Sequence, residues 1–416
     1  MTLLQVEEAL DLILSNAPAR RIERRPLSES LGLIVAEEII AAEPLPPFPR
    51  SGMDGYAVRS ADTRRATREQ PVTLKLLGVI PAGHPMEEPV LPGTTASIMT
   101  GGAIPAGADA VIRMEEARVS PAGIMIYRPV EPAENVAPIG EDVTDGQVLL
   151  RPGHRVRPAE VNLLAALGID EVPVFAPPRV GILCTGDELV SAGAEPGYGQ
   201  IRNSNGPGLA ALVRSAGGIP LDLGTAHDAA DVIAGALGQH LDCELILTTG
   251  GVSVGDFDVV RETLTVMGAR QLFWRVAMKP GTPVCAALLQ ERLVIGLSGN
   301  PSAAITNFDL MVRPLLDTLC GRARVGLRAV EGVLDQPVLK SNPLTRYLRA
   351  HVYNGPVGEL RIDTDMAQRA GVLSSMIHAN AYVVVPGHSG PLPAGSRLKV
   401  LLHNDTEVQF SVPVSV

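Results

Sequence analysis

From residue 179 onward, the sequence alternates apolar runs of strand length with amphipathic runs of helix length. Strands joined by helices form right-handed crossovers, so this alternation predicts a mostly parallel, doubly wound α/β sheet. Such sheets bind ligands at the carboxyl ends of their strands, where the polar residues of this region concentrate. The expected strands are 180–184, 243–247, 271–278, 284–289 and 293–297, and the expected helices are 207–216, 229–240, 259–267 and 302–319.

A glycine-rich turn at 248–258 directly follows the expected strand 243–247 and precedes an expected helix. This order presents backbone N–H groups to an anion, and glycine lets the backbone approach a ligand closely. The turn also carries hydroxyls and carboxylates, which favours a phosphorylated ligand held together with a divalent cation. The alternative is a tight turn that contains glycine for steric reasons alone. The candidate residues of this turn are Gly250, Gly251, Ser253, Gly255 and Asp258.

Acidic residues follow several expected strands and indicate a metal site. Asp187 and Glu188 come directly after 180–184, and Asp228 and Asp258 lie near other strand ends. Carboxylates beside an anion-binding loop repel phosphate unless a cation lies between them. Because the group contains neither histidine nor cysteine, it favours Mg²⁺ over Zn²⁺. The alternative for Asp187 and Glu188 is capping of a following helix.

Two further turns carry candidate anion-binding residues. Lys279 follows an expected strand, and the adjacent proline restricts the backbone so that the charge is aimed in one direction. Arg275 is expected on the same strand and the same face, because side chains alternate with a period of two. In the turn at 298–302, Asn300 offers an amide and Ser302 a hydroxyl at a helix start, although ordinary helix capping is an equal alternative.

The remaining segments suggest additional domains, since 416 residues are too many for one hydrophobic core. The segment 45–138 contains short strand-like runs between Gly and Pro turns, which predicts a β-rich module. After residue 326, short strands recur and predict a small β-barrel or sandwich. Helical spacing is found at 3–15, 28–40 and 158–167.

Composition excludes several classes of protein. A net charge of −10 and an aromatic content of 3% disfavour nucleic acid as a partner. No apolar run reaches the roughly 20 residues that a membrane span requires, and the N-terminus does not resemble a signal peptide. The four cysteines are widely spaced, which favours free thiols in the cytoplasm. Motifs of hydrolase triads, P-loops and zinc sites are missing from the sequence.

Seven motifs occur in order along nearly the whole chain: Ser51-Gly52-Met53-Asp54-Gly55-Tyr56-Ala57, Thr100-Gly101-Gly102, Gly140-Glu141-Asp142, Thr185-Gly186-Asp187-Glu188-Leu189, residues 249–255, Lys279-Pro280-Gly281 and Gly299-Asn300-Pro301. With these motifs the chain resembles the molybdopterin molybdenumtransferase family, which includes MoeA and the gephyrin E-domain. The resemblance implies an elongated N-terminal domain at 1–44 and 139–177, and a β-rich domain inserted at 45–138. It also implies a molybdopterin-binding α/β domain at 178–325 and a C-terminal β-barrel at 326–416.

The family's reaction inserts molybdate into adenylylated molybdopterin and releases AMP, with Mg²⁺ assisting. The resemblance further implies a homodimer, with a molybdopterin adenylyltransferase as the upstream partner. Carried onto this sequence, the implied catalytic residues are Asp54, Glu188, Asp228, Asp258 and Lys279, and the implied metal ligands are Asp187, Glu188 and Asp258. The implied substrate-binding residues are Thr100, Thr185, Gly250, Gly251, Ser253, Gly255, Arg275, Asn300, Ser302, Arg349 and Ser375.

Three positions depart from the family's pattern. Arg275 stands where lysine is common, Thr282 replaces the second lysine of a Lys-Pro-Gly-Lys turn, and Ser298 replaces a proline. These changes concern substrate affinity rather than reaction class. Two other interpretations remain: a pterin adenylyltransferase, which uses a similar glycine loop, and a dimeric scaffold without catalysis. The choice between molybdate and tungstate is left open, because the two oxyanions have nearly the same size and charge.

Overall fold

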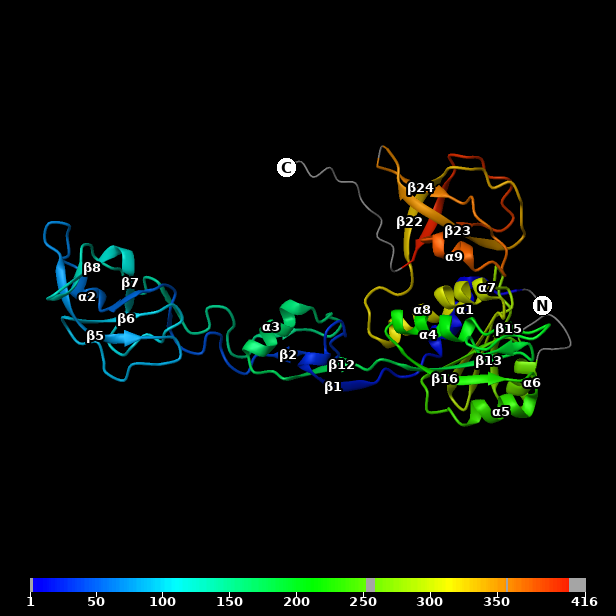
Figure 1. Cartoon of the computed structure of the whole chain (residues 1–416), viewed down its shortest axis with the longest axis horizontal. Coiled ribbons are helices and arrows are strands. Elements are labelled where there is room, and N and C mark those ends of the chain that lie inside the picture. The colour runs from blue at the N-terminus through cyan, green and yellow to red at the C-terminus, as the bar shows by residue number, and fades with distance from the viewer. Residues whose placement is uncertain (1–2, 252–258, 357, 404–416) are drawn as a thin grey trace. The chain divides into compact units, whose positions relative to one another are not determined.

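The computed structural model describes residues 3–251, 259–356 and 358–403, with its elements labelled in Figure 1. The chain divides into two compact units. One unit contains Met1–Glu23 and Pro173–Val416, and the other contains Arg24–Val172. Ser253, Gly255 and Asp258 of the predicted site lie outside the described residues.

The first unit is built on a six-stranded sheet with the order β16-β13-β17-β21-β20-β18. The first four strands in this order run parallel, and the last two are antiparallel to their neighbours. The predicted mostly parallel sheet is therefore confirmed, with β16 as a strand that the periodicity did not reveal. The strands are β16 (Ile219–Ala226), β13 (Arg179–Thr185), β17 (Leu245–Thr249), β21 (Arg292–Leu297), β20 (Cys285–Leu289) and β18 (Arg270–Trp274).

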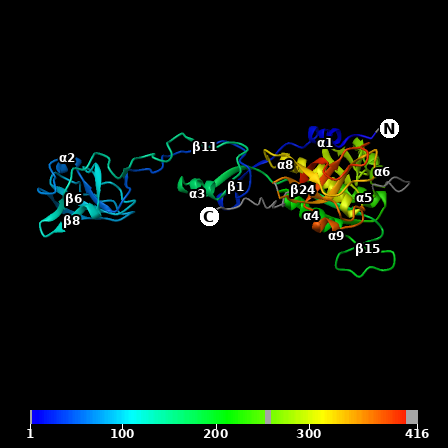
Figure 2. The same ribbon diagram turned by 90° about the horizontal axis from the view of Figure 1, so that it is seen from above.

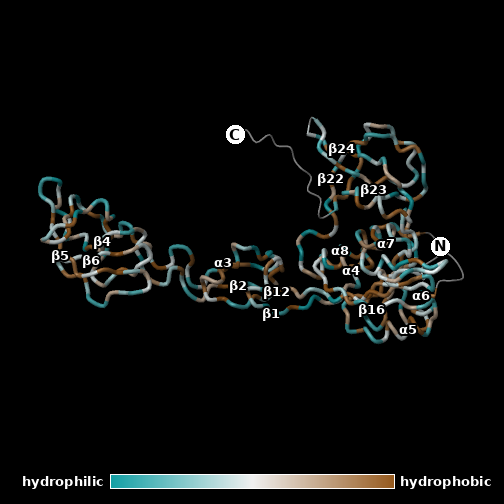
Figure 3. Tube along the Cα trace, viewed as in Figure 1, coloured by the Kyte–Doolittle hydropathy of each residue, from teal (hydrophilic) through white to brown (hydrophobic). Residues whose placement is uncertain are grey.

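Helices cover both faces of this sheet, as the alternation of buried side chains along the strands requires. Leu245 and Leu247 of β17 belong to a core shared with α1, α4 and α8, whereas Ile246 belongs to a core shared with α5 and α6. In Figure 3, hydrophobic brown segments run through this sheet. The helices are α1 (Val6–Ser15), α4 (Asn205–Ser215), α5 (Ala230–Gly238), α6 (Val259–Val266), α7 (Pro301–Asn307) and α8 (Arg313–Leu319), with a π-helical segment at Phe308–Val312.

The N-terminal segment differs from the sequence-based expectation in one place. Helix α1 buries Val6, Ala9 and Ile13 in the α/β core, and Met1–Glu23 are grouped with that unit. The helix expected at 28–40 is wrong. Strand pairing near residue 150 replaces it, because the backbone of Gly32 adopts a φ of +82° and its N–H donates to Val156.

The second unit contains a six-stranded sheet with the order β7-β4-β6-β5-β9-β8, as the β-rich segment predicts. A helix, α3 (Pro158–Ala166), lies outside this sheet at the position expected from sequence. The strands are β4 (Gly55–Val58), β5 (Val72–Ile80), β6 (Thr94–Ile98), β7 (Ala110–Arg113), β8 (Ala117–Ser120) and β9 (Gly123–Ile126).

The C-terminal region closes into a five-stranded barrel, which confirms the predicted barrel. Its strands are bonded in the order β23-β24-β22-β26-β25, and β25 pairs back onto β23. The short strand β19 (Met278–Lys279) extends from the α/β region and pairs with β23. The barrel strands are β22 (Arg328–Leu334), β23 (Thr345–Asn354), β24 (Leu360–Asp363), β25 (Ala381–Val385) and β26 (Arg397–Leu402).

Candidate active site

A cleft of about 370 Å³ opens at the carboxyl ends of β13, β17 and β21. Three loops that the sequence singled out meet there, because the ends of parallel strands lie along one edge of the sheet. We refer to it as the strand-end cleft. Its lining includes Thr185, Gly186, Glu188, Asn205, Asp228, Gly250, Gly251, Ser298, Gly299 and Asn300.

Glycine is required in the loop that follows β17. Gly250 and Gly251 have φ values of +96° and +59°, which side chains other than glycine rarely adopt. A Cβ atom on Gly250 would lie 2.1 Å from the carbonyl oxygen of Thr185. The close approach of two loops, rather than chain flexibility, explains the Gly-Gly pair, and it leaves backbone as one wall of the cleft.

Asn205 ties three loops of the cleft together. Its Nδ2 donates to the hydroxyl of Thr249 at 2.8 Å and to the carbonyl of Gly299 at 2.9 Å. The hydroxyl of Thr249 in turn donates to the carbonyl of Ser298 at 3.0 Å. Helix α4 therefore begins against the loops that follow β17 and β21, and Asn205 holds the cleft's shape. The sequence analysis missed this residue, although two Asn flank Ser204 at the start of a helix.

Acidic groups gather on one side of the cleft. Asp187 Oδ1 accepts a hydrogen bond from the backbone N–H of Asp228 at 3.2 Å and lies 3.0 Å from His227 Nδ1. His227, then the Asp228 N–H, lowers the pKa of Asp187. The pKa of Asp228 is raised instead, first by burial and then by the charges of Asp187 and Glu188. Three like charges so placed would be relieved by a cation.

The predicted ligand set for Mg²⁺ is only partly described. Glu188 and Asp228 line the cleft and Asp187 contacts the loop of Asp228, whereas the predicted ligand Asp258 lies outside the described residues. Within 3–251, 259–356 and 358–403, no group of three His, Cys, Asp or Glu side chains is arranged to hold a metal ion. The expectation that this group contains no histidine is wrong, because His227 contacts Asp187. The carboxylate oxygens fit Mg²⁺, and the metal site stays a prediction.

The predicted cations lie apart from this cleft lining. Arg275 does not share a strand face with Lys279, because β18 ends at Trp274 and Arg275 adopts a φ of +69°. Lys279 is exposed on β19 and pairs in register with Arg346 of the barrel strand β23. Arg346 is buried, and its Nε and Nη2 have no hydrogen-bond partner among the described residues. Lys279 and Arg346 are therefore neighbours on paired strands, one exposed and the other buried.

Two other predicted ligand residues form a contact between the barrel and the α/β region. Arg349 is buried, and its Nη1 donates to the hydroxyl of Ser302 at 2.9 Å. Ser302 is also buried and donates to the carbonyl of Ala370 at 2.6 Å. The N-cap of α7 is Asn300, so the suggested capping by Ser302 is wrong. Ser375 is buried and donates to the carbonyl of Val372 at 3.1 Å.

Asp54 and Thr100 belong to the second unit. Asp54 Oδ1 accepts hydrogen bonds from both the backbone N–H and the hydroxyl of Thr100, each at 2.7 Å. These two bonds lower the pKa of Asp54, which is exposed. Thr100 thus stabilises the ionised carboxylate of Asp54.

Family models cover nearly the whole chain. The MoeA N-terminal region (domain I and II) matches residues 4–168, and a probable molybdopterin binding domain matches residues 181–318. The MoeA C-terminal region (domain IV) matches residues 331–403. The molybdopterin molybdenumtransferase of Bacillus subtilis (strain 168) is 36% identical over 419 residues, which cover 99% of this chain and 97% of the relative.

The chain belongs to the molybdopterin molybdenumtransferase family. The enzyme of that name from Staphylococcus aureus (strain MSSA476) is 34% identical over 404 residues, which cover 95% of each chain. A crystal structure titled molybdopterin biosynthesis MoeA protein, from Pyrococcus horikosii, has a TM-score of 0.83 at 30% identity and covers 96% of this chain and 99% of its own. These findings confirm the predicted family, fold and class of enzyme, a transferase of molybdenum cofactor biosynthesis. In the described residues, no helix is long and apolar enough to cross a membrane.

Proposed function

We propose that this protein inserts molybdate into adenylylated molybdopterin and releases AMP, with Mg²⁺ bound by acids of the strand-end cleft. The observation that carries the proposal is the convergence of a glycine-built wall and three acids at one sheet edge, in a chain that matches a member of the family over 99% of its length. The phosphoanhydride of such a substrate needs both features: close backbone approach and a cation.

Each part of the cleft has a definite task in this proposal. The backbone at Gly250, Gly251 and Gly299 lets the phosphates approach without steric hindrance. Glu188 and Asp228, with Asp258 and Asp187, would hold Mg²⁺, which when bound neutralises charge on the phosphates. Asn205 keeps the three loops in place through its hydrogen bonds.

The cations are assigned to the incoming oxyanion. Lys279 is exposed, and the neighbouring Arg346 has buried nitrogen atoms without a protein partner among the described residues. Two such charges attract a dianion such as molybdate. Arg275 is the third cation of this set, with a buried Nε that also has no partner in the described part of the chain.

Other roles predicted from sequence stay proposals. Arg349 and Ser375 are kept as substrate-binding candidates, although the hydrogen bonds above place Arg349 in a structural contact. A cytoplasmic location and delivery of substrate by a molybdopterin adenylyltransferase rest on the family resemblance, and the four buried free cysteines agree with a reducing compartment.

A turnover assay tests the function directly. Purified protein is incubated with adenylylated molybdopterin, Mg²⁺ and molybdate, and released AMP and protein-bound molybdenum are quantified together. We expect AMP and metallated cofactor to form in equal amounts, and omission of Mg²⁺ to slow both. Absence of AMP release from the complete mixture contradicts the proposal. Consumption of ATP with metal-free molybdopterin would instead identify an adenylyltransferase.

We also propose a homodimer in which the Asp54 turn of one subunit serves the other subunit's cleft. The proposal is supported by the hydrogen-bonded carboxylate of Asp54, which belongs to a different unit from the one that forms the cleft. Mixing Asp54→Asn and Glu188→Gln proteins tests this, because random exchange of subunits would restore up to about a quarter of wild-type sites. If Asp54 acts within its own chain, the mixture stays inactive. A monomer in sedimentation analysis also contradicts the proposal.

A further inference from the structure

A second pocket, of about 410 Å³, lies between the edge strand β16 and helix α4. We refer to it as the β16–α4 pocket, and its volume is in the range of small-molecule sites. None of the residues predicted from sequence lines it. Those that matter for its chemistry are Ile182, Pro207, Ala210, Arg214, Pro220 and Asp222.

Local features of both elements create this space. On α4, Gly206 and Ala210 face the pocket with little or no side chain. On β16, the pairing with β13 shifts register between Ile182 and Cys184, and Gly224 adopts a φ of +84° there. A bulge of this kind bends an edge strand away from its neighbours and is common beside functional sites. The pocket is thus a consequence of the backbone as well as of small side chains.

The β16–α4 pocket adjoins the strand-end cleft through a single side chain. Asn203 lines both spaces. Its Oδ1 accepts from the backbone N–H of Gly206 at 2.9 Å, and its Nδ2 donates to the hydroxyl of Thr225 at 3.2 Å. Asn203 is therefore held as a fixed partition, and one extended ligand can occupy both spaces around it.

The lining suits a planar heterocycle rather than a phosphate. Ile182, Pro207 and Pro220 offer apolar surface for the faces of a ring. Asp222 and Arg214 offer an acceptor and a donor for its edge, and one oxygen of Asp222 is already used by the N–H of Gly224 at 2.9 Å. Arg214 forms no ion pair within the described ranges of the chain. Because Asp222 and Arg214 carry opposite charges, this lining does not favour an anion. It can instead accept and donate hydrogen bonds along the edge of a nucleotide base.

The order of the strands indicates which part of the substrate would lie here. β16 is one edge of the sheet, whereas Pro283, which also lines the strand-end cleft, lies two residues before β20 near the other edge. Lys279 and Arg275 belong to the same chain segment as Pro283, so the oxyanion and the pterin that receives it are assigned to that end. The proposed function assigns the phosphates to the glycine wall between these ends, so the nucleoside is left for the β16 end.

We propose that the β16–α4 pocket binds the adenine ring of the adenylylated substrate and of the AMP product. This inference rests on the proposed function for its choice of ligand. It assigns Ala210 and Asp222 to nucleotide recognition, a role separate from the acids that assist the reaction.

Filling the pocket tests the proposal without touching the strand-end cleft. Ala210→Phe places a ring where the adenine would lie, and Ala211→Phe is the matched control, because the exposed Ala211 is its neighbour on α4 but does not line the pocket. In titration calorimetry with AMP, we expect Ala210→Phe to weaken binding by at least about tenfold and Ala211→Phe by less than about twofold. Inorganic pyrophosphate, which has no base, should bind equally to both variants and the wild type. Equal AMP affinity in the two variants overturns the proposal.

A second variant keeps the test decisive if Ala210→Phe does not fold. Asp222→Asn changes an exposed side chain, and its predicted effect concerns selectivity. The Asp222 carboxylate accepts a hydrogen bond from the exocyclic amino group of adenine, whereas IMP carries an oxo group there. Wild type should bind AMP at least about fivefold more tightly than IMP, and Asp222→Asn should lose that preference. An unchanged preference overturns the assignment, as does competition by a free pterin for the pocket in place of AMP.

These binding measurements are independent of turnover. If the wild type binds AMP in the pocket but releases none from adenylylated molybdopterin, the proposed function fails and the adenine site stands. If turnover proceeds while the filled variant binds AMP normally, the adenine site fails and the function stands.

Discussion

Two carboxylates at strand ends, Asp54 and Asp228, are held in opposite ways. Asp54 precedes β4 in the second unit and accepts two hydrogen bonds from Thr100, which lower its pKa. Asp228 follows β16 in the first unit, and burial together with two neighbouring acids raises its pKa. Two hydrogen-bond donors stabilise the ionised form of Asp54. Burial and neighbouring negative charges destabilise the ionised form of Asp228.

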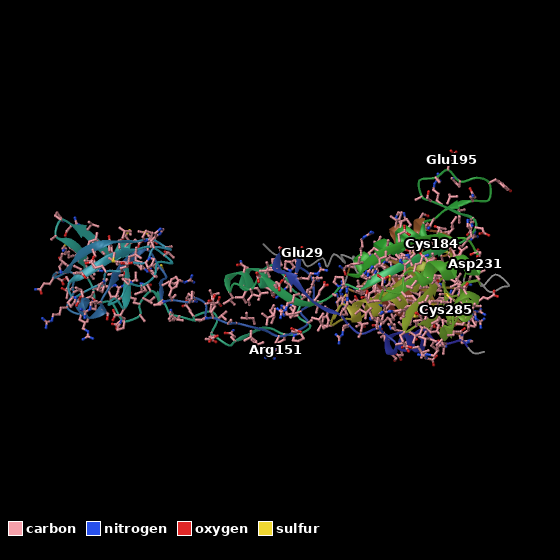
Figure 4. All side chains as sticks on the ribbon, turned by 90° about the horizontal axis from the view of Figure 1, so that it is seen from below. Glu29, Arg151, Cys184, Glu195, Asp231 and Cys285 are labelled. Carbon is pink, nitrogen blue, oxygen red and sulfur yellow. The ribbon has the colours of Figure 1, made fainter. Side chains whose placement is uncertain are left out.

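The opposite pKa shifts of Asp54 and Asp228 indicate which kind of ligand each carboxylate can bind. A carboxylate already satisfied by hydrogen bonds is a fixed acceptor, suited to orienting a donor or a water molecule. A group of acids that raise one another's pKa is suited to a cation, because the cation removes the repulsion. Cys184 of β13 lines the strand-end cleft together with Glu188 and Asp228. Figure 4 labels Cys184 in the α/β region and Glu195, which lies out on a loop.

The largest expected effect comes from removing one acid of the cleft. Glu188→Gln keeps the shape but removes a charge that we assign to Mg²⁺ binding, so AMP release should fall by roughly 10²-fold or more. Glu195→Gln is the control, since Glu195 is exposed on the loop between β14 (Leu189–Val190) and β15 (Ile201–Arg202), which is visible in Figure 2. Similar rates for the two variants would remove Glu188 from the site.

A backbone substitution tests whether the cleft's wall depends on close packing. Gly250→Ala introduces a Cβ that would meet the Thr185 carbonyl at 2.1 Å, so we expect a loss of roughly 2–4 kcal/mol in the free energy of unfolding. Gly208→Ala in α4 is the control, because no atom lies within 4 Å of its Cβ and alanine favours a helix by up to about 1 kcal/mol. Urea denaturation measures both, and a harmless Gly250→Ala would refute the packing argument.

The Asp54 turn offers a smaller effect that concerns pH. Thr100→Val removes one of the two donors, so the pKa of Asp54 should rise toward its ordinary value. Since the ionised form is then lost at a higher pH, the acid limb of the pH–rate profile should move upward and the rate near neutrality should change by less than about fivefold. Thr100→Ser retains the hydroxyl and should restore the profile. An unmoved acid limb in Thr100→Val would show that Asp54 does not limit the reaction.

The smallest effect concerns the free energy of unfolding, and it tests whether the pKa of Asp228 is raised whereas that of Asp54 is lowered. Because its folded pKa is raised, ionised Asp228 destabilises the fold above that pKa and has no such effect well below it. Without Mg²⁺, Asp228→Asn should therefore be more stable than wild type at pH 7 by up to about 0.5 kcal/mol, since the group is exposed, and not at pH 3. Added Mg²⁺ should stabilise wild type and reverse the order. A variant that is less stable at pH 7 without Mg²⁺ would contradict the raised pKa.

Much of the fold could be predicted from local patterns. The alternation after residue 179 indicated the strands around β17 and β21 correctly, because buried strands and amphipathic helices have different periods. The same reasoning failed at 28–40, where apolar spacing resembled a helix. Pairing with a distant segment near residue 150 outweighs local propensity there, and no local pattern reports such pairing.

The candidate site divides in the same way. Glycine turns and acids at strand ends were recognisable from sequence because their residue types carry the chemistry themselves. Asn203 and Asn205 were not, since an asparagine at the start of a helix is ordinarily a cap. Only the tertiary structure shows that Asn203 separates two pockets and that Asn205 joins several loops. Arg275 was misplaced because its backbone leaves the strand at a positive φ, which the two-residue period does not foresee.

By itself, the sequence determined the α/β alternation, the glycine turns and the motifs of the family, because each of these depends on residues close together in the chain. Only the tertiary structure decided which acids repel one another, that Ser302 is buried under Arg349, and that a second pocket adjoins the cleft. The physical reason is that burial and electrostatic interaction depend on distance in space, which packing sets between segments far apart in sequence.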